Sequence, residues 1–152
     1  MDLKRPVLIV GAGSSGLVAA KNLKELGISF EVLEKADDVG GIWYEGNPTS
    51  SVYRSTHLIS SKPLTEYTDF PMPAHYPHYP NRQQVWEYFK AYAGHFNLYP
   101  SIRFNTEITR LEKIDNGWQA HLSNGEKRQY RAVIIANGHN WDPKYTGISG
   151  SI

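Results

Sequence analysis

The spacing of apolar residues changes twice near the start of the chain. Val7–Val10 is a short apolar run rich in β-branched residues, as expected for a strand that is buried on both faces. Apolar positions then recur at helical spacing from Leu17 to Leu26, and Gly27 is a natural helix stop. Phe30–Leu33 reads as a second strand. This order predicts a βαβ unit with a right-handed crossover.

The second half of the chain predicts another helix and several short strands. Asn81 is placed to cap a helix that runs to about Phe96 and carries its aromatic residues on one stripe. Strand-like runs joined by Asn-Gly turns, in which both central residues need a positive φ, predict a three-stranded antiparallel meander. These runs are 108–114, 118–122 and 127–130. Residues 132–136 form a last apolar strand.

Residues 45–80 show neither the helical spacing of apolar residues nor strand-like apolar runs. Five of the nine prolines lie between Pro63 and Pro80, and four aromatic residues are interleaved with them. A long connection of this kind is usually functional or disordered, and its aromatic content argues against disorder. We expect a packed, irregular segment that lies over the rest of the molecule.

Composition narrows the class of protein. The chain has 152 residues with 16 Lys and Arg against 15 Asp and Glu, so the net charge is +1, which disfavours a nucleic-acid or anionic-membrane partner. No apolar run approaches the ~18 residues of a transmembrane helix. The absence of cysteine excludes disulfides and cysteine-ligated metals. The start lacks the apolar stretch of a secretory signal, so we expect a cytoplasmic protein.

Two further features are expected to be ordinary structure, and a third depends on which side of its helix it occupies. His75 and His78 have a ligand-like spacing, but no third ligand lies nearby in sequence, so no metal site is expected. The charged cluster at 21–25 reads as a solvated helix face. Trp86, if it lay on the exposed side of its helix, would suggest a covering partner.

The turn after the first strand carries the three-glycine fingerprint Gly11-x-Gly13-x-x-Gly16. The first glycine permits the tight turn, the second allows a pyrophosphate to approach the backbone, and the third allows close packing of helix and strand. The helix N-terminus then offers unpaired N–H groups to phosphates. Ser14 and Ser15 add hydroxyl donors. The spacing and its βαβ context predict dinucleotide binding.

Glu34, at the end of the second strand, favours particular dinucleotides. A carboxylate there can accept both hydroxyls of an adenosine ribose and repels a 2′-phosphate, so FAD or NAD is preferred over NADP. Gly40-Gly41 and Trp43 follow, where simple NAD dehydrogenases usually continue into a helix. The meander, followed by an apolar strand and the turn at 136–138, is similar to the layout of flavoproteins with two dinucleotide-binding domains. This arrangement therefore favours FAD.

The chain resembles the N-terminal FAD-binding part of the flavin-containing monooxygenases, the class that includes Baeyer–Villiger-type relatives. The resemblance implies an α/β, Rossmann-like FAD-binding fold, with a parallel sheet and the three-stranded antiparallel meander. It spans nearly the whole chain, and segments 53–62 and 69–73 are its most specific parts. The matching segments are 11–17, 34–43, 53–62, 69–73, 79–80, 88–96 and 136–139.

In this family NADPH reduces FAD, and the reduced flavin reacts with O2 to a C4a-hydroperoxide that transfers one oxygen atom to a soft nucleophile, an amine or a sulfide. The resemblance places residues 56–60 near the isoalloxazine and the backbone of Ile108 near adenine. The residues expected by position to hold FAD are Gly11, Gly13, Ser14, Ser15, Gly16, Glu34, Lys35, Gly41, Ile42, Trp43, Thr56, His57, Ile59, Ser60, Ile108, Ala136, Asn137 and Gly138.

Two departures from the family pattern bear on activity. A Ser-Asn or Thr-Asn pair that many members carry falls on Leu58 and Ile59 here, and an aliphatic side chain cannot donate that asparagine's hydrogen bond, so no catalytic residue is assigned. The glycine fingerprint that binds NADPH is missing. Residues 1–152 are therefore expected to be the FAD-binding domain, the N-terminal part of a larger two-domain enzyme. Its NADPH site lies outside this chain, which alone should be inactive.

Two alternatives remain open at the level of sequence. The chain could be a stand-alone FAD-binding module without catalysis, or an NAD-dependent oxidoreductase. For the monooxygenase the partners are a small-molecule substrate and O2. The candidate protein partners are the remainder of the enzyme and a second copy of the chain.

Overall fold

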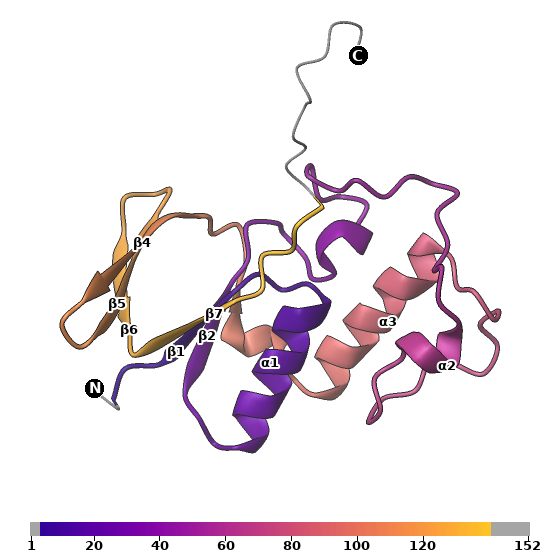
Figure 1. The fold of residues 1–152 in the computed structure, drawn as a ribbon, viewed down its shortest axis with the longest axis horizontal. Coiled ribbons are helices and arrows are strands. Elements are labelled where there is room, and N and C mark those ends of the chain that lie inside the picture. Colours follow the sequence, from indigo (N-terminus) through magenta and orange to yellow (C-terminus); the bar gives the residue numbers. More distant parts are fainter. Residues whose placement is uncertain (1–3, 141–152) are drawn as a thin grey trace, which may run out of the picture.

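A parallel sheet of four strands, in the order β3-β2-β1-β7, forms the centre of the molecule (Figure 1). The structure is a computed structural model and describes residues 4–140. The strands of this sheet are β1 (Val7–Val10), β2 (Phe30–Leu33), β3 (Ile102–Arg103) and β7 (Ala132–Ile135). A second, antiparallel sheet has the order β4-β5-β6 and contains β4 (Ile108–Ile114), β5 (Gly117–Leu122) and β6 (Lys127–Tyr130). Both predicted sheets are confirmed.

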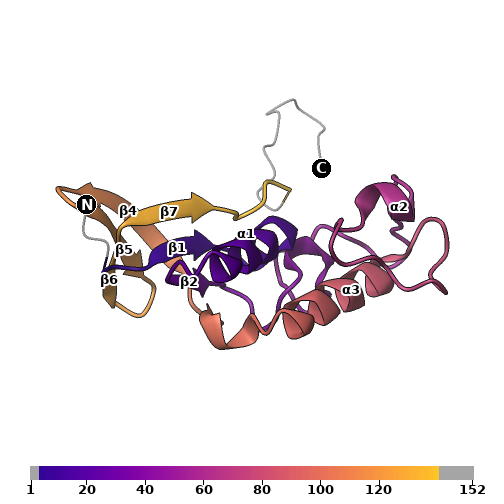
Figure 2. The same cartoon turned by 90° about the horizontal axis from the view of Figure 1, so that it is seen from below.

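The helices lie on one side of the parallel sheet. They are α1 (Ser14–Glu25), α2 (Lys62–Thr65) and α3 (Arg82–His95), with one-turn 3-10 helices η1 (Gly41–Trp43) and η2 (Tyr99–Ser101). Helix α1 contacts the strands and also α3, and both views show it between them (Figures 1 and 2). Asn81 caps α3 as predicted: its side chain accepts the N–H of Gln84, whose side chain accepts the N–H of Asn81, each at 3.0 Å.

Two hydrophobic clusters cover the two faces of the sheet, because successive residues of a strand point to opposite faces. Ile9 belongs to the larger cluster, with Tyr88 and Tyr92 of α3. Leu8 belongs to the smaller cluster, with Leu122 of the meander. The fold is therefore layered, with helices, parallel sheet and meander in that order.

The proline-rich segment at 45–80 is packed, as predicted. Met72 and Tyr76 are buried in the larger cluster at 5% and 9% exposure. The ammonium group of Lys62 donates hydrogen bonds of 3.1–3.2 Å to the carbonyls of Pro73, Ala74 and Tyr76. One charged side chain thus binds three carbonyls of a segment that has little regular secondary structure.

The charged cluster at the end of α1 is a solvated face only in part: Lys24 and Glu25 are exposed, as predicted, whereas Lys21 is buried. Lys21 is 9% exposed, and its ammonium group lies 2.5 Å from the carboxylate of Asp69, which holds the pKa of Lys21 above its usual range. Lys24 donates to the carbonyls of Phe96 and Asn97 at 2.9 and 2.6 Å. These side chains fasten α1 to the irregular segment and to the end of α3, contacts between residues far apart in the sequence.

The hairpins form where predicted, but their turns differ from the expected type. In the described residues positive φ occurs at Gly117 (+150°) and Gly125 (+85°) and not at Asn116 or Asn124. The side chain of Asn124 instead accepts the N–H of Glu126 at 2.9 Å. Asparagine stabilises this turn through a side-chain hydrogen bond, so only the glycine needs the left-handed region.

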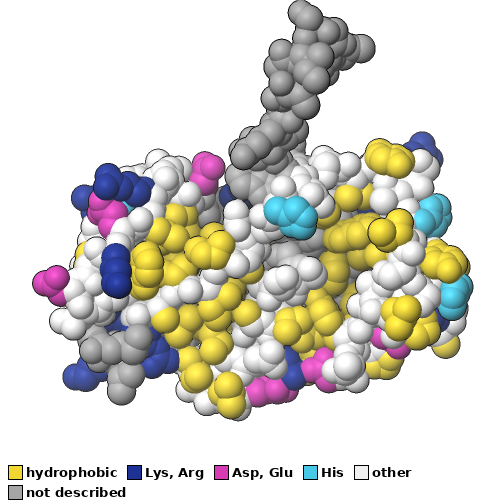
Figure 3. All heavy atoms as spheres, viewed as in Figure 1, with side chains coloured by type: hydrophobic (Ala, Val, Ile, Leu, Met, Phe, Trp, Pro, Cys, Tyr) yellow, Lys and Arg dark blue, Asp and Glu magenta, His cyan; other side chains and the backbone are white. Residues whose placement is uncertain are grey.

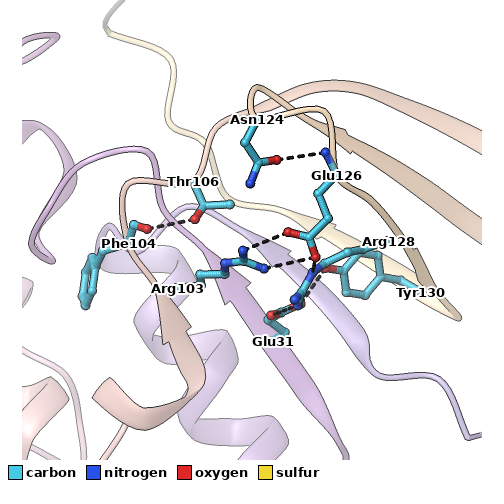
Figure 4. Close-up of polar contacts among 8 residues, drawn as sticks. All are labelled: Glu31, Arg103, Phe104, Thr106, Asn124, Glu126, Arg128 and Tyr130. Carbon is cyan, nitrogen blue, oxygen red and sulfur yellow. Dashed lines mark hydrogen bonds and ion pairs between the residues drawn. The ribbon is translucent and has the colours of Figure 1, made fainter.

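A polar network joins the meander to the parallel sheet (Figure 4). Glu126 accepts from Arg103 of β3 at 2.8 Å and from Arg128 of β6 at 2.6 Å. Arg128 also contacts Glu31 of β2, which accepts the hydroxyl of Tyr130 at 2.6 Å. Arg103 and then Arg128 lower the pKa of Glu126 from 4.5 to about 2. The network fixes the meander over one end of the sheet.

Charged and apolar side chains are distributed unevenly over the described surface. Figure 3 shows charged side chains gathered at the meander end of the molecule, and apolar side chains across its centre and its helical end. The large apolar side chains that are exposed are Leu26, Tyr53, Ile59, Leu64, Tyr79 and Ile135.

Candidate functional site

A cavity of about 750 Å³ opens at the carboxyl ends of β1, β2 and β7. Its walls come from the turn into α1, from η1, from the start of β4 and from residues 136–140. Within the sheet, β2 lies on one side of β1 and β7 lies on the other. This is the switch point at which open α/β sheets bind their ligands, and the volume is typical of a small-molecule site.

Two of the three fingerprint glycines are required by the protein itself. Gly11 has a φ of +96°, and a Cβ there would lie 2.7 Å from the carbonyl oxygen of Ala136. A Cβ at Gly16 would lie 1.9 Å from the carbonyl oxygen of Gly11. The tight turn and the close packing of helix on strand therefore both have a steric cause, as the pattern predicts.

Gly13 differs, because no protein contact forbids a side chain there. Its φ is −76°, and the nearest atom to a Cβ would be the Cα of Gly41 at 3.7 Å, an ordinary contact. Gly13 lies at the start of α1 and lines the cavity. Apart from its chain neighbours, the only described atoms near that Cβ position belong to Gly41, which also lines the cavity, so the space lies beside the cavity and the first turn of the helix, whose N–H groups have no partners within the helix.

The Gly40-Gly41 turn forms the wall opposite the phosphate turn. The N–H of Gly40 donates to the carbonyl of Ala12 at 3.0 Å. Gly41 has a φ of +58°, and a Cβ there would lie 3.2 Å from the Cα of Gly13. Two glycine turns that are distant in sequence therefore approach each other backbone to backbone, and Trp43 lines the cavity beside them.

Glu34 lines the cavity and has a structural role that sequence reasoning missed. Its side chain is 5% exposed, and its two carboxylate oxygens accept the N–H groups of Ala12 at 2.6 Å and of Ala36 at 2.8 Å. The carboxylate thus ties the phosphate turn to the end of β2. Two oxygens offer about four acceptor sites, so this arrangement leaves acceptor capacity for hydroxyl groups.

Thirteen of the eighteen expected FAD residues line the cavity: Gly11, Gly13, Ser14, Ser15, Glu34, Lys35, Gly41, Ile42, Trp43, Ile108, Ala136, Asn137 and Gly138. Gly16 lies behind the wall, against Gly11. Residues 56–60 are not among the lining residues. They run beside the start of α3, where Arg82 N–H donates to Thr56 and Leu58 N–H donates to Pro80, each at 2.9 Å.

Within residues 56–60 two side chains stand out. Ile59 is completely exposed. The hydroxyl of Thr56 is buried and has no hydrogen-bond partner in the described part of the chain. None of residues 56–60 lines the described cavity. The assignment of this segment to the isoalloxazine therefore stays a prediction.

Several lining residues were not predicted. Asn47 is one, with 7% exposure, and its amide donates to the carbonyl of Gly41 at 3.0 Å, so it braces the glycine turn. Its position shortly after the Gly-Gly-Ile-Trp run was the signal available. Gly40, which the paired-glycine pattern places close to a ligand, also lines the cavity, and the unpredicted lining residues are Val10, Leu33, Asn47, Thr49, Thr106, Glu107, Thr109, Arg110, Leu111, Ile135, His139 and Asn140.

Across residues 4–140 no group of three His, Cys, Asp or Glu side chains is arranged to hold a metal ion. The rings of His75 and His78 instead each contact the tyrosine that follows them, at centroid distances of 5.0 and 4.9 Å. No helix in this range is long and apolar enough to cross a membrane.

Comparison with known proteins identifies the family. Residues 4–146 match the family described as flavin-binding monooxygenase-like. The chain is 34% identical to flavin-containing monooxygenase 5 of Rattus norvegicus, over 92% of this chain and 28% of that protein.

Two solved structures extend the comparison. A flavin-containing monooxygenase from Stenotrophomonas maltophilia is 27% identical with a TM-score of 0.76, over 88% of this chain and 38% of that one. A cyclohexanone monooxygenase mutant from Rhodococcus sp. Phi1, bound to NADP+, is 25% identical with a TM-score of 0.79, over 88% of this chain and 26% of that one. The chain thus spans less than a third of the curated relative's length. By family match and by identity, it belongs to the flavin-binding monooxygenases.

Proposed function

We propose that the cavity holds FAD. The observation that carries this proposal is Gly13, the fingerprint glycine that no protein contact requires and whose open side faces the cavity. The pyrophosphate would lie against Gly13 and the N–H groups of the first turn of α1, with the Gly40-Gly41 turn opposite. Glu34 would accept the ribose hydroxyls. The backbone of Ile108, at the start of β4, would border the adenine.

We propose further that the complete enzyme is an NADPH-dependent monooxygenase, with residues 1–152 as the N-terminal FAD-binding part. The bound FAD supplies the oxygen-transfer chemistry, with NADPH as reductant and one atom of O2 passing to a soft nucleophile, an amine or a sulfide. Family membership supports this proposal, as does the NADP+ bound to the cyclohexanone monooxygenase relative. The chain's own residues bind and orient the cofactor and shield it from water.

Titration of the purified chain with FAD tests the proposal. We expect saturable binding, visible as quenching of flavin fluorescence, and no competition by NADH at equal concentration. NADH that binds more tightly than FAD would assign the cavity to an NAD-dependent oxidoreductase. A folded chain that binds neither dinucleotide would refute the proposal. NADPH oxidation by the FAD-loaded chain separates a self-sufficient enzyme from a binding part, and we expect none.

A further inference from the structure

Trp86 of α3 contacts the Gly40-Gly41 turn from outside the cavity. Its indole N–H donates to the carbonyl of Val39 at 3.0 Å. Its ring lies so close to Gly40 that a Cβ there would be 2.7 Å from the ring carbon Cδ1. Gly40 lines the cavity and Trp86 does not, so the ring supports the turn from behind. The indole therefore packs against the chain itself, so the condition under which it would have suggested a covering partner, an exposed position on its helix, is not met.

The indole is itself held in place by two neighbours. The ring of Tyr44 stacks on it, with a centroid distance of 5.1 Å and an interplanar angle of 27°. The ammonium group of Lys90 lies 3.6 Å from the ring centroid, a cation–π contact. The hydroxyl of Tyr44 donates to Asp37 at 2.6 Å, just before the turn. An anchored indole is a rigid support, since few of its rotamers are compatible with these contacts.

The Gly40-Gly41 turn contacts the phosphate turn directly. Gly40 N–H donates to Ala12, the residue between the first two fingerprint glycines. A Cβ at Gly41 would lie only 3.2 Å from the Cα of Gly13, so the two backbones are in close contact. A displacement of the turn by a few tenths of an ångström would move the wall that faces Gly13.

We infer that Trp86 is a positioning residue for the dinucleotide site, which it serves by fixing the Gly40-Gly41 turn at the distance that the pyrophosphate requires. This inference rests on the proposed function. It also gives a reason for the glycine at position 40: a φ of +116° disfavours any side chain, and the indole occupies the space where one would lie.

The test compares Trp86→Phe and Trp86→Leu with Trp118→Phe. The control removes an indole from β5, which does not line the cavity. Trp86→Phe keeps an aromatic ring behind the turn and loses the hydrogen bond to Val39, so we expect the FAD dissociation constant to rise about fivefold, equivalent to ~1 kcal/mol. Trp86→Leu also loses the stacking on Tyr44, and we expect a rise of about tenfold or more. Trp118→Phe should stay within twofold of the wild type.

Gly40→Ala adds a measurement that distinguishes positioning of the turn from a general effect on stability: its effect on FAD binding is compared in the wild-type and Trp86→Leu backgrounds. In the wild-type background its methyl group meets the indole, whereas beside Trp86→Leu only the backbone strain remains. We expect Gly40→Ala to weaken FAD binding less in the Trp86→Leu background than in the wild type. Dissociation constants are measured at a temperature where circular dichroism shows every variant folded. If Trp86→Leu does not fold, Trp86→Phe decides.

The outcomes separate the two proposals. A wild-type chain without FAD affinity refutes the proposed function. A wild-type chain that binds FAD, with Trp86 variants that bind within twofold of it or no more weakly than Trp118→Phe, refutes the positioning role alone. Unfolding midpoints that fall while the dissociation constant holds would likewise assign Trp86 to stability only.

Discussion

Replacing Gly13 by alanine separates the fold from the ligand more cleanly than any other change in the cavity. The backbone of Gly13, with φ −76° and ψ −171°, is an extended conformation that alanine adopts without strain. The added methyl group would contact only Gly41, whose Cα and N would lie 3.7 and 4.0 Å away. The same change at Gly16 would place a Cβ 1.9 Å from a carbonyl oxygen and would damage the fold.

The expected magnitudes follow from these contacts. Gly13 is the N-cap of α1, where alanine is less favourable than glycine, but alanine also restricts the unfolded chain. The two effects oppose each other, so the free energy of unfolding should change by less than about 1 kcal/mol. For FAD, the methyl group would displace phosphate oxygens from backbone N–H groups. Losing one or two charge-assisted hydrogen bonds costs about 2–3 kcal/mol, which is roughly a 30- to 150-fold rise in the dissociation constant.

Urea denaturation without ligand and a fluorescence titration with FAD measure the two quantities on the same preparation. Gly94→Ala is the matched control, since Gly94 lies within α3 and a Cβ there would have no atom within 4 Å. The control should bind FAD like the wild type. A stable Gly13→Ala variant that also binds FAD like the wild type would refute the placement of the pyrophosphate. A variant that unfolds would refute the conclusion that the protein tolerates a methyl group there.

Two further predictions concern carboxylates. Glu34→Gln replaces one acceptor by an amide group that faces a backbone N–H, so we expect a loss of about 1–3 kcal/mol of stability together with weaker FAD binding, both measured as for Gly13→Ala; unchanged stability would contradict the role of the two hydrogen bonds to Ala12 and Ala36. The pKa of Glu126 is lowered from 4.5 to about 2, so the folded state binds the proton less readily than the unfolded state, and the stability that this carboxylate contributes above about pH 4.5 is lost as the pH falls toward 2. Urea denaturation of wild type and Glu126→Gln should therefore show a stability difference that shrinks over this range, and a difference independent of pH would contradict the pairing with Arg103 and Arg128.

The sequence predicts the features that depend on short-range patterns. Val7–Val10 and Phe30–Leu33 have the predicted bounds, because short, mainly apolar runs and the glycine turn between them are local signals. The steric reasons for Gly11 and Gly16 were also readable, since they follow from one strand–turn–helix geometry. The conformation of the Asn-Gly turn at Asn124 could not be predicted in this way, because a side-chain hydrogen bond competes there with the left-handed conformation.

The features that sequence reasoning missed join residues far apart along the chain. Trp86 bonds to Val39, 47 positions earlier, and Lys21 pairs with Asp69 across a similar separation. No local period marks such pairs. The structural role of Glu34 was missed for another reason: a ligand role alone accounts for a carboxylate at this position, so nothing in the sequence pointed to its two backbone partners.

The candidate site depends on both layers that cover the parallel sheet, although its sequence signature lies in one short segment. The helical layer holds the phosphate turn: the hydroxyl of Tyr67 donates to the carbonyl of Ser14 at 2.8 Å, and Tyr67 N–H donates to the hydroxyl of Tyr88 on α3. The meander supplies the wall around Ile108, held to the sheet by the Glu126 network. A βαβ unit alone would carry the fingerprint but neither support. The proposed affinity for a dinucleotide would therefore depend on the three-layer packing as well as on the glycine turn.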